Sequence, residues 1–197
     1  MRLEPFDFSG QGETLMAVIL GALLATLSGI AATQLEAHFK RRERQRDAAL
    51  LFGELLSTVR ILLLTAEDAR GRGDPYGPVT MRSLHAARRE LDIYDRNRER
   101  LYDIRDAALR VKIHAVVVRI AMPLDGIIDA SADLAARPDD AGLEPLRRVR
   151  GQGFDYLIGL RAEVAPVVAD LGRLARHSFT AYGPDAADAA PTATPPP

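Results

Sequence analysis

The chain has 197 residues, is 47% hydrophobic and 27% charged, and carries a formal net charge of −1. This length suits one helical domain with appendages, and the balanced charge argues against a nucleic-acid partner. The absence of cysteine excludes disulfides, thiolate catalysis and cysteine-ligated metals. Arginine outnumbers lysine by 24 to 2, a bias that we interpret as the mark of a GC-rich bacterial genome.

The first predicted element is a membrane-spanning helix over residues 14–35. These 22 positions carry no charge, and as a helix they span about 33 Å, close to the hydrocarbon thickness of a bilayer. The alternatives are a secretion signal and a buried core helix. A secretion signal carries its positive charge before the apolar run, and a core helix of this length shows a polar face. Neither feature is present here.

Basic residues follow this apolar run. Lys40, Arg41, Arg42, Arg44 and Arg46 occur within seven positions, whereas Arg2 is the only basic residue before the run. Basic residues flank membrane helices on the cytoplasmic side, and near the surface each attracts anionic headgroups by about 1 kcal/mol. We therefore expect a single-pass protein of the bacterial inner membrane, with residues 1–13 as a short extracytoplasmic tail and the C-terminus in the cytoplasm.

Small residues recur every four positions along the predicted anchor. This stripe consists of Ala17, Gly21, Ala25, Gly29 and Thr33. Small residues allow two membrane helices to approach closely, so the stripe predicts self-association through the anchor. The alternative is that the stripe reflects only the high content of small residues in this segment.

Residues 36–177 show helical periodicity in four segments, and no strand pattern of any length occurs. The first apolar face comprises Ala48, Leu51, Phe52, Leu55, Val59, Leu62, Leu63 and Ala66, and a loop follows over residues 69–78. A second helix, with Thr80 as its expected cap, presents Leu84, Ala87, Leu91, Tyr94 and Leu101. A break is expected near Tyr102, because Asp103 and Asp106 resemble a capping pair.

The third helix is expected to pack through Ile104, Ala108, Val111, Ala115, Val118, Met122 and Ile128, with a kink at Pro123. A fourth helix starts near Leu143 and presents Leu146, Val149, Gly153, Leu157, Leu160, Val164, Val167, Leu171 and Leu174. Residues 178–197 are rich in Ala and Pro and are predicted to be disordered. The predicted fold is all-α: one transmembrane helix continuing into a cytoplasmic antiparallel bundle of about four helices.

No pattern indicates catalysis, a cofactor or a metal. The four histidines have no partner at metal-ligand spacing, and the chain lacks a phosphate loop and a nucleophile motif. Asp125, Asp129 and Asp133 share one helix face, which we interpret as a solvated acidic face. We therefore expect no enzymatic activity.

Charge is distributed unevenly over the second and third helices. Residues 80–119 hold ten basic and six acidic residues, and residues 120–140 hold one basic and five acidic residues. The densest polar segment, residues 94–100, is the candidate partner-binding face and includes Tyr94, Arg96, Asn97, Arg98 and Arg100. Helix-spaced ion pairs are expected between Asp92 and Arg96 and between Asp95 and Arg98. The alternative is an exposed, salt-bridged face without a partner.

The leading functional hypothesis is a membrane-anchored scaffold that presents a helical domain to an unidentified cytoplasmic protein. The second is a stress or defence effector, or a sensor, whose bundle controls anchor packing and perturbs the bilayer. A stalk subunit like that of a rotary ATP synthase would also have a short outer tail and a single anchor. Gly71, Gly73, Pro75 and Pro78 interrupt the helix that such a stalk needs.

Overall fold

The computed structural model describes residues 8–137 and 141–179. The regular structure in these ranges is helical throughout, without a strand, which confirms the predicted all-α class. The chain divides into two compact units, Met1–Glu43 and Arg44–Pro197. Predictions for residues 1–7 and 180–197, which include most of both tails, fall outside the described residues.

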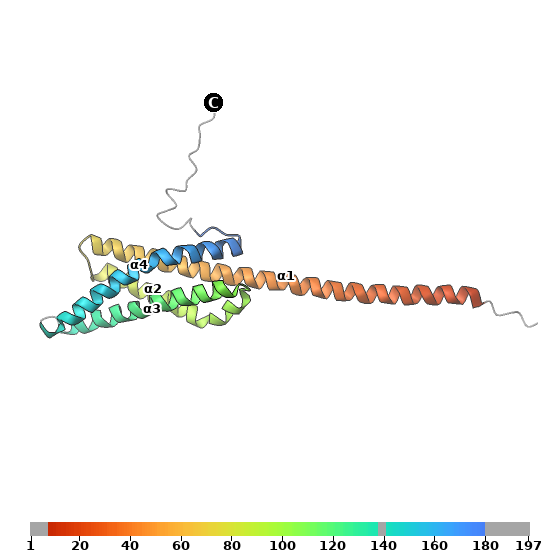
Figure 1. Ribbon diagram of the computed structural model, residues 1–197, viewed down its shortest axis with the longest axis horizontal. Coiled ribbons are helices and arrows are strands. Elements are labelled where there is room, and N and C mark those ends of the chain that lie inside the picture. Colours follow the sequence, from red (N-terminus) through yellow and green to blue (C-terminus); the bar gives the residue numbers. More distant parts are fainter. Residues whose placement is uncertain (1–7, 138–140, 180–197) are drawn as a thin grey trace, which may run out of the picture. The chain divides into compact units, whose positions relative to one another are not determined.

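Four long helices and two short 3₁₀ helices make up the structure (Figure 1). In chain order they are α1 (Phe8–Gly71), α2 (Pro78–Arg96), η1 (Arg98–Asp103), α3 (Ala107–Ala136), η2 (Ala141–Leu143) and α4 (Glu144–Ala175). Helix α1 ends and α2 begins within the loop predicted over residues 69–78. Helix α4 begins one residue after the predicted start, and a proline occupies its first turn as expected.

The first unit contains the uncharged part of α1. The large apolar side chains that the structure describes in this unit are exposed, with Leu20 and Leu27 each 61% accessible. The hydroxyls of Thr26, Ser28 and Thr33 each donate to the carbonyl oxygen four residues earlier, at 2.8, 2.7 and 2.5 Å. These three hydroxyls thus have partners within their own helix, as an apolar environment requires.

By length and apolar composition, α1 is the one helix in the described part of the chain that could cross a membrane. Its burial is divided along its length. The described large apolar side chains from Leu20 to Phe39 are exposed, whereas Ala48, Phe52 and Leu63 are buried. In the most apolar 18-residue segment of α1 between Leu20 and Gly71, 44% of the residues are buried within the protein.

The second unit buries one continuous core formed by all four long helices. Side-chain contacts connect each long helix to others in this unit. Phe52 of α1 contacts Tyr94 of α2, with ring centroids 5.7 Å apart, and Tyr94 stacks on His114 of α3. Arg119 of α3 pairs with Glu163 of α4, and Arg46 of α1 donates to the carbonyl oxygen of Ala175 in α4.

The predicted apolar faces of α1 and α2 are buried almost throughout, and that of α4 is buried from Leu157 to Leu171. Of the face predicted for the third helix, only Ile104 and Ile128 pack in the core, and the rest of that prediction is wrong. Ala108, Val111, Ala115, Val118 and Met122 are exposed. The buried residues of this helix are instead Leu109, Ile113, Val116, Val117, Ile120, Leu124, Ile127, Ala130 and Leu134. Helix α3 is apolar on both sides, so periodicity alone could not select the packed face.

The N-cap residues of α2 and α3 also differ from the expected ones. The N-cap of α2 is Gly77 and not Thr80, which lies inside the helix, where its hydroxyl donates to the carbonyl oxygen of Asp74 at 2.6 Å. The N-cap of α3 is Asp106, the second residue of the expected capping pair and not the first, and its carboxylate accepts from the amide of Leu109 at 3.1 Å. The break after α2 is occupied by η1.

Candidate functional site

The candidate partner-binding face over residues 94–100 does not form one exposed surface. Tyr94 is 1% exposed, and its hydroxyl lies 2.9 Å from Nδ1 of His114. Burial raises the pKa of Tyr94 above its usual value near 10. Tyr94 is therefore a core residue that joins α2 to α3.

Of the remaining residues in this segment, two bind carbonyl oxygens of α2 and two are exposed. The Asn97 side chain donates to the carbonyl oxygen of Ile93 at 2.8 Å, and the Arg96 guanidinium donates to that of Asp92 at 3.2 Å. Arg98 and Arg100 are exposed. The expected pairing of Asp92 with Arg96 is wrong, because the Asp92 carboxylate pairs with Arg88 at 2.5 Å. Arg98 has no ion pair with a described residue, so the expected pair with Asp95 is also absent.

The anchor stripe has open space beside its glycines. A Cβ atom added to Gly21 or Gly29 would meet nothing within 4 Å. Ala25 and Thr33 are exposed, and the side chain of Ala17 lies outside the described ones. The stripe is therefore available for a second helix, although no contact in the described residues shows one.

The basic residues after the anchor have different partners. Lys40 pairs with Glu36 at 2.6 Å, and the side chains of Arg41, Arg42 and Arg44 are exposed. The guanidinium of Arg46 donates at 3.1 Å to the carbonyl oxygen of Ala175, at the last turn of α4. Arg46 thus satisfies a free helix carbonyl and also complements the negative end of the α4 dipole.

The surface that the sequence reasoning missed is the outer face of α3. Ala108, Val111, Ala115, Val118 and Met122 recur at helical spacing and form one exposed apolar stripe, which we call the α3 stripe. Val111 is 68% exposed and Met122 is 72% exposed. Large apolar residues gathered on one exposed helix face are typical of an interaction site.

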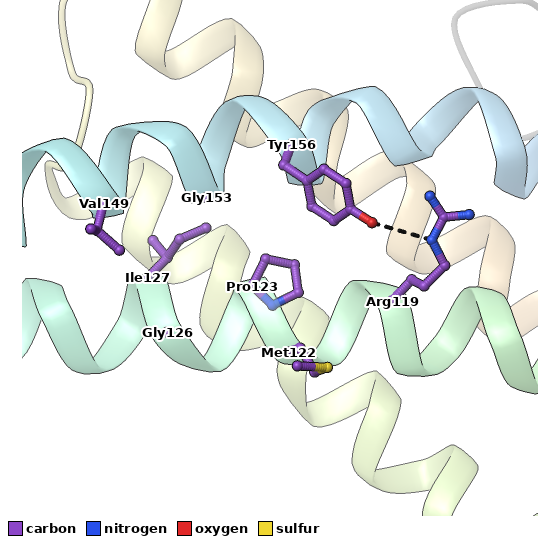
Figure 2. A pocket seen from close by; sticks show the side chains of 8 residues that line it. All are labelled: Arg119, Met122, Pro123, Gly126, Ile127, Val149, Gly153 and Tyr156. Carbon is purple, nitrogen blue, oxygen red and sulfur yellow. Dashed lines mark hydrogen bonds between the residues drawn. The ribbon is translucent and has the colours of Figure 1, made fainter.

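A groove between α3 and α4 continues this stripe (Figure 2). Its volume is about 420 Å³, and its lining residues are Arg119, Met122, Pro123, Gly126, Ile127, Val149, Gly153 and Tyr156. Gly126 of α3 and Gly153 of α4 line the groove without contributing a side chain to it. A Cβ atom on Gly126 would meet nothing within 4 Å, so the groove has room for a side chain from another molecule.

The ends of the groove differ in charge. At one end, the Arg119 guanidinium donates to the hydroxyl of Tyr156 at 3.2 Å and pairs with Glu163, so its charge is already compensated. Beyond the other end, Asp129 and Asp133 follow Gly126 along α3. Both are exposed and have no ion pair with any residue in 8–137 or 141–179. The apolar surface therefore borders an uncompensated acidic patch.

Within the same described ranges, no three histidine, aspartate or glutamate side chains are grouped as metal ligands would be. Comparisons of the chain with protein-family models, with curated proteins and with solved structures found no match.

Proposed function

We propose that the chain is a single-pass protein of the bacterial inner membrane that presents an antiparallel helical bundle to a cytoplasmic protein partner. In this proposal residues 14–35 span the bilayer, and residues 36–177 form the interaction domain. The lipid bilayer and a helix from another protein are its two partners.

The observation that carries the proposal is the division of burial along α1. An uncharged stretch with exposed leucines precedes a stretch whose side chains fill the core of the second unit. Leu20, Leu23, Leu24 and Leu27 are each more than half exposed. Transfer of such side chains from water to hydrocarbon is favourable by about 25 cal/mol per Å². A bilayer supplies the apolar surroundings that this segment lacks within its own unit.

The docking surface in this proposal is the α3 stripe with its adjoining groove. An amphipathic helix fits both features, because one apolar side chain can enter the groove while its neighbours pack along the stripe. Asp129 and Asp133 favour basic residues on the flank of such a helix. Complementary charge of this kind accelerates association and fixes orientation.

Membrane insertion and orientation provide the test. A reporter enzyme that is active only in the periplasm, fused after Phe179, is expected to stay inactive, because Lys40 to Arg46 hold the following chain in the cytoplasm. The protein is also expected to resist extraction from membranes by alkaline carbonate. A fusion before residue 14 serves as the control and should be active.

An active reporter after Phe179 would contradict the proposed orientation. Release of the chain into the soluble fraction by carbonate would contradict the anchor itself. In that case the exposed leucines of α1 would have to be covered by protein instead of lipid.

A further inference from the structure

We propose that the η1 turn is a second membrane contact, which binds anionic phospholipid headgroups beside the anchor. The inference rests on the proposed function, because it takes the chain to be inserted through residues 14–35. Its basis is the placement of exposed arginines and an exposed tyrosine at one end of the second unit.

The η1 turn lies at the end of the core where the second unit begins. Tyr94, at the last turn of α2, packs on Phe52 of α1, and η1 follows within four residues. Figure 1 shows the last turn of α4 at the same end. Arg46 of α1 donates to the carbonyl oxygen of Ala175 in that turn. The opposite end of α3 lies about 45 Å away along its 30 residues.

Chain connectivity keeps this end close to the membrane. Eight residues, 36–43, separate Leu35 from the start of the second unit, and they reach at most about 30 Å when fully extended. As a helix the same residues cover about 12 Å. The η1 end therefore contains the first residues of the helical core that follow the tether along the chain.

The side chains at this end suit an interfacial contact. Tyr102 is 82% exposed although its neighbour Leu101 is buried. Arg98, Arg100 and Arg105 are also exposed, and they form no ion pair with any described residue. Tyrosine is enriched at the level of lipid headgroups, and arginine binds phosphate with a planar set of donors.

Acidic residues occur in the same segment, and they do not cancel this surface. Asp106 is occupied as the cap of α3. Asp95 and Glu99 are exposed, and Asp103 at the end of η1 is half-buried, but arginine side chains are longer and extend their charge beyond shorter carboxylates. Arg176, exposed after α4, adds a further cation at this end.

The test uses the full chain in bilayer nanodiscs, with a fluorophore on one introduced cysteine. The chain contains no cysteine, so each label is unique. Ala107→Cys places the label on the first residue of α3, beside η1, and Ala136→Cys places it on the last residue of the same helix. Both alanines are exposed. The readout is quenching by lipids that carry a doxyl group near the headgroup.

In bilayers of phosphatidylcholine mixed with phosphatidylglycerol, the label at 107 should be quenched and the label at 136 should not. Replacing Arg98, Arg100 and Arg105 together by Gln should lower the ratio of docked to undocked chains on the order of a hundredfold, since each basic residue contributes about fivefold. Arg82, Arg137 and Arg148, which are all exposed and form no ion pair with a described residue, provide a matched triple replacement that should have no effect. Added salt should weaken the quenching of the parent.

Equal quenching of the two labels would overturn the inference, as would equal quenching in pure phosphatidylcholine or no effect of the triple replacement at η1. Those results would leave the anchor intact, because nanodisc incorporation is scored separately. Failure of the chain to enter nanodiscs at all would overturn the proposed function and this inference together.

Discussion

Gly53 shows how a single missing side chain positions a distant segment. Phe179 follows α4 and is 6% exposed, and a Cβ atom on Gly53 of α1 would overlap its ring. The Phe179 ring also contacts His177, with the ring centroids 4.9 Å apart. Gly53 is therefore needed for close packing against Phe179, although a glycine inside a helix is unfavourable by itself.

We expect Gly53→Ala to lower the free energy of unfolding by about 1–3 kcal/mol, as overpacking of a core does. In a Phe179→Ala background the same change should be neutral or stabilising, because alanine is favoured over glycine in a helix by about 1 kcal/mol. Chemical denaturation of the four variants measures this coupling. Gly159→Ala is the control, since its Cβ atom would meet nothing within 4 Å. An equal cost of Gly53→Ala in both backgrounds would show that Phe179 does not occupy this site.

Tyr94 illustrates where residue types alone mislead. Its spacing with Leu84, Ala87 and Leu91 predicts a core position, and its place among charged residues predicts an exposed face. The structure satisfies the first prediction, because Tyr94 packs on Phe52 and its hydroxyl meets His114. A tyrosine can be buried when its hydroxyl has a partner, and sequence spacing within one helix cannot reveal a partner on another.

At the scale of the helices, α1 and α2 follow their sequence patterns because each has one apolar face and one charged face. Helix α3 does not, because both its Leu109–Ile113–Val117 side and its Val111–Val118–Met122 side are apolar. Contacts with α2 and α4 decide which side is buried. The groove between α3 and α4 was likewise not predicted from the sequence. Its signal in the sequence is weak: one glycine in each of the two helices, at positions 126 and 153.

The anchor stripe makes a prediction at the same scale. If Ala17, Gly21, Ala25 and Gly29 form a helix–helix contact, Gly21→Leu or Gly29→Leu should weaken self-association of residues 1–47 by about 1 kcal/mol or more. Membrane helices have little hydrophobic drive to re-pack around added bulk. A two-hybrid assay in membranes measures the association. Leu at Ala22 or Ala31, which are exposed and off the stripe, should matter less.

Equal signals for the on-stripe and off-stripe variants would show that the stripe reflects only the high content of small residues in this segment. Any self-association would then have to come from charged surfaces of the second unit, and it should weaken as salt is added.

For the whole molecule, the proposed scaffold role requires that the α3 stripe and groove bind a helix while the anchor holds the chain at the membrane. Gly126→Leu separates binding from folding, because the added side chain fills the groove without meeting another atom within 4 Å of its Cβ position. Replacing glycine inside a helix also favours folding, so a loss of binding in this variant is not explained by unfolding.

We expect a photo-crosslinking amino acid at Val118, in native membranes, to capture a helix whose flank carries Lys or Arg. Gly126→Leu should reduce the yield at least tenfold, equivalent to about 1.4 kcal/mol, and Gly159→Leu on α4 should not.

Replacing both Asp129 and Asp133 by Asn should lower the crosslinking yield and make it less dependent on salt, because the acidic patch then attracts basic residues less. Mass spectrometry of the crosslinked peptide identifies the occupant. A yield unaffected by Gly126→Leu would contradict groove binding, and a captured α3 from a second copy would make this face a self-association surface.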